Sequence, residues 1–247
     1  MEKAYAIIPA AGLSTRMGST TTGQARKPLI EVGGAPILIH TLRKWDGIPG
    51  LAAIYVPARA EDREAIAARV AEERFQTPVR VLEGGNARQE SVWNALEEIA
   101  AIAAVAAREP GADPLIAVHD AVRPFVARET IIAALTAAER HGAVIVALPA
   151  VDTVKQVERS AGDSNRITAT LQRERIVLAQ TPQVFRLSLL QQAYAKAIED
   201  GFHATDEAAL VEHLGHDVFV VPGSAHNWKI TTPADLPLAQ IFLSLLA

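Results

Sequence analysis

The sequence of 247 residues contains no cysteine. This absence excludes disulfides, thiolate metal sites and cysteine nucleophiles, and it is compatible with a reducing compartment. A strong excess of one charge is absent too, because the formal net charge is -4 at pH 7. No global positive charge indicates a polymer-binding surface, so we expect a small metabolite as partner, with no nucleic acid and no membrane.

Long apolar runs are also missing. The longest uninterrupted one, Ile99 to Ala107, is too short to cross a bilayer. The first residues lack the basic and apolar segments of a secretory signal, so we expect a cytoplasmic protein. Hydrophobic residues nevertheless make up 49% of the chain, which is enough to bury a sizeable core. We expect one α/β domain over residues 1–247.

The common phosphate-binding signatures are absent from the first loop. The apolar run at residues 4–10 ends in small residues up to Gly12, where backbone N–H groups can approach phosphate oxygens. The next glycine is Gly18, so neither a dinucleotide-binding nor an ATPase loop motif is present. Arg16 and Lys27 instead bring two cations that could neutralise a triphosphate. Spacing alone does not distinguish them from ordinary surface cations.

Short apolar runs alternate with longer amphipathic segments along the chain, which predicts a mostly parallel sheet with helices on both faces. Strands are expected at 4–10, 51–58, 79–85, 114–124, 142–150 and 217–223. Helices are expected at 36–45, 61–74, 87–108, 128–141, 188–199 and 205–214. A last helix follows, with Thr232 as its cap, Pro233 at its first position and Asp235 in its first turn. Ligands usually bind at the carboxyl ends of such strands.

Residues 151–182 interrupt this alternation of strands and helices. Apolar and polar residues alternate there on either side of a polar turn, which predicts an exposed β-hairpin that projects as an arm. Partly apolar faces of such an arm are commonly buried against another subunit, and a solvated hairpin fits the pattern equally well.

The segment PAAGLSTRMG…ARKPL resembles the nucleotidyltransferase signature that lies over a triphosphate. Further segments, in order over nearly the whole chain, resemble the 2-C-methyl-D-erythritol 4-phosphate cytidylyltransferase family. They are EGGNARQESVWNAL at 83–96, VHDAVRP at 118–124, VDTVK at 151–155, LAQTPQVF at 178–185, ATDEAALVEHLG at 204–215 and NWKITTPADL at 227–236. One departure is Lys27-Pro28-Leu29, where the family usually has Lys-Gln-Phe or Lys-Gln-Tyr.

The resemblance implies a Rossmann-like nucleotidyltransferase fold with a dimerisation arm at about 151–182. It also implies transfer of CMP from CTP to 2-C-methyl-D-erythritol 4-phosphate with release of pyrophosphate, in isoprenoid precursor synthesis. A ribitol 5-phosphate cytidylyltransferase is the alternative, because it shares the first loop, the VHD…RP motif and the arm. A non-catalytic nucleotide-binding regulator is a further alternative, which the joint presence of Arg16, Lys27, Asp120 and Lys229 disfavours.

The resemblance assigns catalytic roles to Arg16, Lys27 and Lys229, around the triphosphate and the reacting phosphorus, together with Mg²⁺. Asp120 follows an apolar run, so it is expected at the carboxyl end of a strand. A carboxylate there can take Mg²⁺, directly or through water, or a substrate hydroxyl. Arg123 in the same loop is either a contact of the substrate or an ion-pair partner.

The resemblance places CTP against one set of small and polar residues: Ala10, Ala11, Gly12, Gly84, Gly85, Arg88 and Ser91. Ser91 could instead cap or line its helix, and the two later glycines could simply turn the chain. The resemblance also implies a homodimer in which the arm presents Thr153 and Arg173 to the partner's polyol phosphate, with Thr181 close by. Arg175 is an alternative to Arg173.

Overall fold

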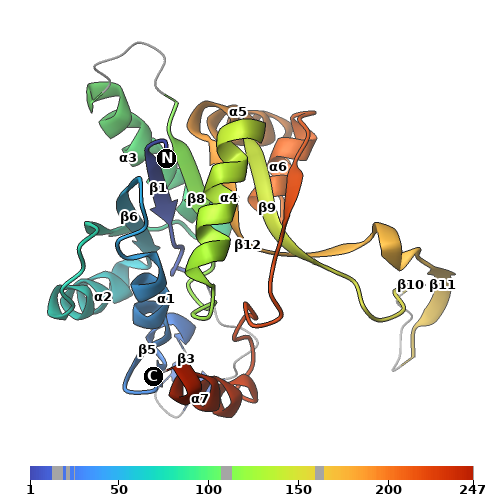
Figure 1. The fold of residues 1–247 in the computed structure, drawn as a ribbon, viewed down its shortest axis with the longest axis horizontal. Helices are drawn as coiled ribbons and strands as arrows, with labels where there is room; N and C mark the ends of the chain where they lie inside the picture. Colours follow the sequence, from blue (N-terminus) through green and yellow to red (C-terminus); the bar gives the residue numbers. More distant parts are fainter. Residues whose placement is uncertain (13–18, 21–22, 25, 107–112, 159–163, 247) are drawn as a thin grey trace.

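The computed structural model describes residues 1–12, 19–20, 23–24, 26–106, 113–158 and 164–246. A seven-stranded sheet in the order β13-β9-β12-β8-β1-β6-β7 forms its centre (Figure 1). The strands are β1 (Ala4–Ile7), β6 (Leu51–Ala58), β7 (Val79–Glu83), β8 (Leu115–Val118), β9 (Ala143–Pro149), β12 (Val177–Arg186) and β13 (Phe219–Pro222). β12 runs antiparallel to both of its neighbours, β8 and β9, whereas the other pairings of this sheet are parallel.

Helices cover both faces of the sheet. One face carries α1 (Ile37–Trp45), α2 (Ala60–Glu72) and α4 (Arg128–His141), and the other carries α3 (Arg88–Ala106), α5 (Leu187–Asp200) and α6 (Glu207–His213). Side chains along a strand alternate between the faces, so Ala6 packs with the first group and Tyr5 with the second. The predicted α/β fold with helices on both faces is confirmed. None of the described helices is long and apolar enough to cross a membrane.

A third, smaller apolar cluster lies beyond the carboxyl ends of the strands. It joins α7 (Asp235–Leu246), β4 (Glu31–Val32) and the start of α1 to the loop after β8, through Val32, Ile37, Val122, Phe125, Ile230 and Ala239. β4 pairs with β5 (Ala35–Pro36), and the short β2 (Ser19–Thr20) pairs with β3 (Gly23–Gln24). The 3-10 turn η2 (Lys27–Leu29) precedes β4. This cluster holds three segments that carry predicted site residues against one another.

The predicted arm is present but shorter than expected. β10 (Lys155–Glu158) and β11 (Arg166–Thr170) form an antiparallel pair that projects from the body in Figure 1. The turn η3 (Arg173–Arg175) follows, and β12 then enters the central sheet. The sequence analysis included 177–182 in the arm because apolar and polar residues continue to alternate there. In the structure these residues belong to β12, where Gln180 and Thr181 are buried.

Among the other boundaries that differ from the prediction, two lie near the candidate site residues. The strand expected over 114–124 ends at Val118, because the chain leaves the sheet there and forms a loop. α7 begins at Asp235 rather than after a Thr232 cap. The Asp235 carboxylate accepts hydrogen bonds from the backbone N–H groups of Thr231 at 2.7 Å and Thr232 at 2.8 Å. Burial raises the pKa of Asp235, but these hydrogen bonds outweigh it and lower the pKa below its ordinary value.

Leucine truncation tests which faces form the core. Leu135 of α4 is 1% exposed, whereas Leu238 of α7 is 54% exposed. We expect Leu135→Ala to lower the free energy of unfolding by about 2–5 kcal/mol, because it removes buried methyl groups and leaves a cavity. The matched change Leu238→Ala is expected to stay within about 0.5 kcal/mol of the parent protein. Urea denaturation measures both, and equal losses in the two variants would contradict this assignment of the core.

Candidate active site

Asp120 reaches the carboxyl edge of the sheet because β8 lies between β1 and β12. The backbone N–H of His119 still donates to the carbonyl of Ile7 at 2.9 Å, so the chain follows the strand to this point. Successive side chains point to opposite sides. His119 is therefore fully buried, and Asp120 lines a cavity. Asp120 therefore follows the carboxyl end of a strand, as the sequence predicts.

A chain of three hydrogen bonds fixes the position of Asp120. The Nε2 atom of His119 lies 3.1 Å from the carbonyl oxygen of Arg123, which can only accept, so Nε2 carries the proton. Burial lowers the pKa of His119 to about 4, so Nδ1 is unprotonated and accepts from the Thr181 hydroxyl at 3.0 Å. The Thr181 oxygen in turn accepts the Asp120 backbone N–H at 3.0 Å. Thr181 thus lies beside Asp120 of its own chain, whereas the sequence analysis placed it with Thr153 and Arg173 of the arm.

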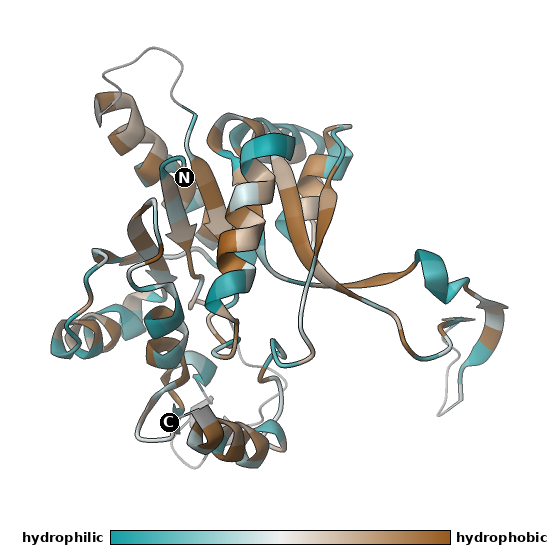
Figure 2. Cartoon of the chain, in the orientation of Figure 1, coloured by the Kyte–Doolittle hydropathy of each residue, from teal (hydrophilic) through white to brown (hydrophobic). Residues whose placement is uncertain are grey.

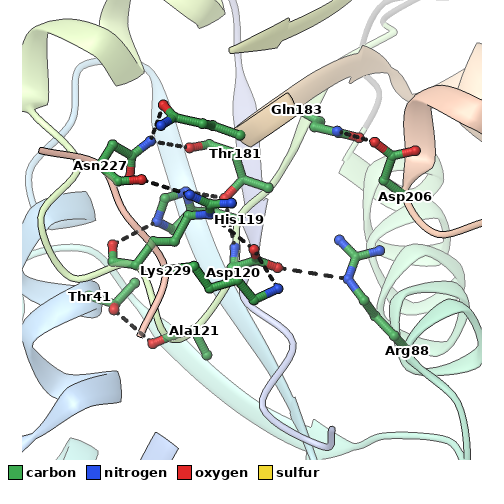
Figure 3. Close-up of polar contacts among 12 residues, drawn as sticks. Thr41, Arg88, His119, Asp120, Ala121, Thr181, Gln183, Asp206, Asn227 and Lys229 are labelled. Atoms are coloured by element: carbon green, nitrogen blue, oxygen red, sulfur yellow. Dashed lines mark hydrogen bonds and ion pairs between the residues drawn. The ribbon is translucent and has the colours of Figure 1, made fainter. Parts of the chain in front are cut away.

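Three cations surround the Asp120 carboxylate, and Figure 3 labels two of them, Arg88 and Lys229. Its Oδ2 atom lies 3.0 Å from Lys229 Nζ and 3.1 Å from Arg123 Nε, and its Oδ1 atom lies 3.9 Å from Arg88 Nε. Burial raises the pKa of Asp120, but the three positive charges outweigh it and hold the pKa well below its usual range. The carboxylate is therefore ionised and holds the cations in place.

The loop after β13 brings Lys229 to Asp120. Asn227 in this loop donates from Nδ2 to the carbonyl of Thr181 at 2.8 Å. The Asn227 carbonyl accepts from Arg123 Nη1 at 2.7 Å. The backbone N–H of Ile230 donates to the carbonyl of Val122 at 3.0 Å. These contacts fasten the loop to β12 and to the loop after β8, on either side of Lys229.

Lys27 approaches the same cavity from η2. Its side chain is 9% exposed, and its Nζ atom donates to the carbonyl of Thr231 at 2.6 Å. Thr231 belongs to the segment that Asp235 holds at the start of α7. Lys27 and Lys229 therefore reach the cavity from segments far apart in the sequence, joined through the third apolar cluster.

The two glycines after β7 allow close packing under the cavity. A Cβ atom on Gly84 would lie 2.8 Å from Ala11 Cβ and 3.0 Å from Ser91 Oγ, so a side chain there would displace the first loop. Ser91 is buried, accepts the Gly85 N–H at 3.0 Å and donates to the Ala87 carbonyl at 2.9 Å. Ser91 therefore fastens the loop to the start of α3 and lines the cavity as well.

Two cavities meet at the charged cluster. The first, of about 160 Å³, is lined by Pro9, Ala10, Gly12, Lys27, Pro28, Arg88, Ser91, Asp120, Ala121, Val122 and Lys229. The second, of about 200 Å³, is lined by Arg88, Asp120, Arg123, Ala179, Gln180, Thr181, Gln183, Thr205, Asp206 and Lys229. Arg88, Asp120 and Lys229 line both. These three charged side chains form a common wall between the cavities, which we call the shared wall.

Some predicted site residues lie elsewhere. Thr153 and Arg173 are exposed on the arm and line neither cavity of their own chain. Arg173 Nη1 donates to the carbonyl of Val151 at 2.8 Å. Ala11, Gly84 and Gly85 are adjacent to the first cavity without lining it. Arg16 lies outside the described residues.

Sequence reasoning missed several polar residues of the second cavity. These are Gln180 and Gln183 of β12 and Thr205 and Asp206 before α6. The first pair was hidden because polar residues in a short run count against a buried strand. The second pair lies in the ATDEAALVEHLG segment, where an aspartate just before a helix is a capping signal. Asp206 does cap α6, accepting the Ala209 N–H at 3.2 Å.

The donor set limits how a metal could be held. Among the described residues, no group of three or more His, Asp or Glu side chains converges on one point. Asp120 is the one acid among the described residues that line the first cavity, and its Oδ1 atom is less closely paired than Oδ2. Mg²⁺ commonly binds through one or two carboxylates together with substrate phosphates and water. The residues present fit an ion held mostly by a nucleotide.

Comparisons with known proteins agree over the full chain. A family model described as IspD, 2-C-methyl-D-erythritol 4-phosphate cytidylyltransferase, matches residues 4–245. A protein of that name from Acidobacterium capsulatum is 49% identical over 98% of this chain and 97% of its own length. Among solved structures, the 4-diphosphocytidyl-2C-methyl-D-erythritol synthase from Anaerococcus prevotii has a TM-score of 0.79 at 30% identity. The match covers 98% of this chain and 96% of that one. The cytidylyltransferase from Thermus thermophilus has a TM-score of 0.71 at 35% identity, covering 99% and 100%.

The buried His119 predicts a pH dependence of stability. Its pKa is about 4 in the folded protein against 6.5 in an open chain. Between these pH values the His119 imidazole is protonated in the unfolded state and neutral in the folded state. The free energy of unfolding therefore falls as the pH is lowered, by up to about 3 kcal/mol. Chemical denaturation from pH 4 to pH 7 should show a smaller decline in His119→Asn. Parallel curves for the two proteins would exclude this role of His119.

Proposed function

Because the chain belongs to the 2-C-methyl-D-erythritol 4-phosphate cytidylyltransferase family, it transfers CMP from CTP to 2-C-methyl-D-erythritol 4-phosphate and releases pyrophosphate, and we propose that this reaction takes place at the shared wall. The reaction belongs to isoprenoid synthesis. The observation that carries the proposal is the convergence of Arg88, Asp120 and Lys229 on a wall common to two cavities. The family match favours this substrate over ribitol 5-phosphate and over a non-catalytic regulator.

The two cavities suit the two substrates. Ala10, Gly12 and Ser91 surround the first cavity with small side chains and backbone groups, which suits the cytosine and ribose of CTP. Arg123, Thr181 and Asp206 give the second cavity the donors and acceptors that a polyol phosphate needs. We assign CTP to the first and the polyol phosphate to the second, so that the α-phosphate and the 4-phosphate meet at the shared wall.

The chemistry then needs position and charge more than proton transfer. An oxygen of the 4-phosphate attacks the α-phosphorus of CTP, and the bond to the β-phosphate breaks so that pyrophosphate leaves with the electron pair. Both reactants are anions, and Lys27, Lys229 and Arg88 offset their repulsion from fixed positions. Asp120 keeps Lys229 at 3.0 Å and so orients its ammonium group. Arg16, outside the described residues, stays a predicted contact of the triphosphate.

Members of this family generally require a metal ion, and we propose Mg²⁺ for this chain. Asp120 would hold it, together with phosphate oxygens of CTP, either directly or through water. When bound, the ion supplies charge neutralisation and a fixed triphosphate geometry.

We also propose a homodimer joined through the arm. Several large apolar side chains of this region are exposed in the single chain, namely Val151, Val157, Ile167, Val177 and Leu178. Figure 2 shows hydrophobic stretches among hydrophilic ones on the projecting arm, and exposed apolar side chains on such strands favour a covering partner. Thr153 and Arg173 would then reach the partner's second cavity. A cytoplasmic location fits this proposal, because the reaction consumes CTP.

Pyrophosphate release tests the reaction and its site together. We expect turnover with CTP, Mg²⁺ and 2-C-methyl-D-erythritol 4-phosphate, and none with ribitol 5-phosphate. Lys27→Ala and Lys229→Met should each lower kcat by at least about 100-fold, because each removes a fixed charge next to the reacting phosphates. Lys196→Ala on α5, which lines neither cavity, is the matched control. Turnover with ribitol 5-phosphate alone would overturn the substrate, and full activity of both cavity variants would overturn the site.

Co-expression of two inactive variants tests the exchanged arm. In a mixed dimer of Lys27→Ala and Arg173→Ala chains, one of the two sites receives an intact body and an intact arm. Random pairing should therefore restore roughly a quarter of the parent activity. Lys27→Ala with Lys229→Met is the control, because both changes lie in the body and leave no intact site. Arg175→Ala in place of Arg173→Ala separates the two arginines. Absence of recovery in both arm pairings would contradict an arm that completes the partner's site.

A further inference from the structure

A buried acid, Glu207, binds the guanidinium group of Arg88 in the shared wall. Its Nη1 and Nη2 atoms donate to the two oxygens of Glu207 at 2.7 and 2.8 Å. Glu207 is 1% exposed and lines neither cavity. A guanidinium group carries five N–H donors, and this two-point contact uses the two between its terminal nitrogens. The Nε atom lies on the side of Asp120, 3.9 Å from its Oδ1 atom (Figure 3).

Glu207 is itself fixed on both sides. Gln183 of β12 donates to the Asp206 carboxylate at 2.8 Å and accepts the Ala208 N–H at 3.1 Å, so one amide group spans the backbone at Glu207. Tyr194 of α5 donates from its hydroxyl to Glu207 Oε1 at 3.2 Å. Burial raises the pKa of Tyr194 well above its ordinary value, so the hydroxyl keeps its proton as donor. Strand β12 and helix α5 therefore hold the carboxylate that holds Arg88.

Stability alone gives a weak reason for this arrangement. Burying an ion pair costs desolvation free energy, and apolar residues of similar volume often stabilise a fold equally well. What a two-point ion pair does provide is direction, because it fixes the plane and the rotation of the guanidinium. Catalysis by charge stabilisation depends on donors that are already oriented before the reaction.

We propose that Glu207 is a positioning residue for the transfer reaction, which fixes the guanidinium group of Arg88 beside the reacting phosphates at the shared wall. The inference rests on the proposed location of the reaction. Glu207 acts through Arg88 and touches neither substrate. Its carboxylate also balances one of the cations, which keeps Arg88 from repelling Lys229 and Arg123 when the cavities are empty.

Glu207→Gln tests the proposal, because the amide keeps the size but loses the two-point contact. We expect kcat to fall about ten- to hundredfold, because misplacement of a catalytic contact carries a penalty of that order. KM for CTP should change less than about threefold, because the positive charge of Arg88 remains. Glu212→Gln, which removes the same charge from an exposed position of α6, should keep the parent kcat. Thermal melting and CTP titration report the folded fraction, so kcat is expressed per folded site.

A double-mutant cycle separates positioning from a structural role. Arg88→Met should lower kcat at least as much as Glu207→Gln, and the double variant should be no slower than Arg88→Met alone. Tyr194→Phe should give a smaller loss than Glu207→Gln, because it removes one of three contacts of the carboxylate. Independent, additive losses in the double variant would overturn the proposal. So would a Glu207→Gln enzyme with the parent kcat per folded site.

Refutation of the role of Glu207 can be distinguished from refutation of the proposed reaction site. If Lys27→Ala and Lys229→Met keep full turnover, the reaction does not occur at the shared wall, whatever Glu207→Gln does. If those two variants are inactive and Glu207→Gln has the parent kcat, the site stands and the role of Glu207 is refuted.

Discussion

The structure depends most on the burial of the Asp120 carboxylate among three cations. A buried carboxylate is costly unless it is paired, and here its partners come from separate parts of the chain. Lys229 follows β13, Arg123 lies in the loop after β8, and Arg88 begins α3. Satisfying one negative charge therefore requires three segments to converge at the carboxyl edge of the sheet. The third apolar cluster and the Asn227 contacts hold them there once they meet.

The parts of the fold and site that follow local rules were predictable from the sequence. Alternating apolar and amphipathic segments predicted the α/β architecture, and the ends of apolar runs pointed to Asp120 and to the loop with Ser91. The antiparallel β12 was not recognised, because Gln180, Thr181 and Gln183 read as polar surface. Each of them is buried and hydrogen-bonded to a distant partner, namely Ser224, Asp120 and Asp206. No local pattern encodes such a partner.

The same reason explains why Glu207 escaped notice while Arg88 did not. An arginine near a glycine-rich loop suggests anion binding, whereas an acid at the start of a helix is ordinary. Its importance arises from a contact 119 positions away in the sequence. The arm shows another kind of limit. Its alternating pattern indicated exposed strands, yet the meaning of Thr153 and Arg173 depends on a second chain, which one sequence pattern does not contain.

The two buried acids of the site, Asp120 and Glu207, also explain how a chain of net charge -4 can attract two anionic substrates. Arg88, Arg123, Lys27 and Lys229 lie around the cavities, and without counter-charges they would repel one another and destabilise the empty site. Asp120 and Glu207 offset part of this repulsion and fix the side chains before substrate arrives. Among the described residues, four cations against the three carboxylates of Asp120, Glu207 and Asp206 still leave a net positive charge around the cavities, so incoming phosphates meet oriented donors that need little rearrangement. Preorganisation and local charge therefore arise from the same buried pairs.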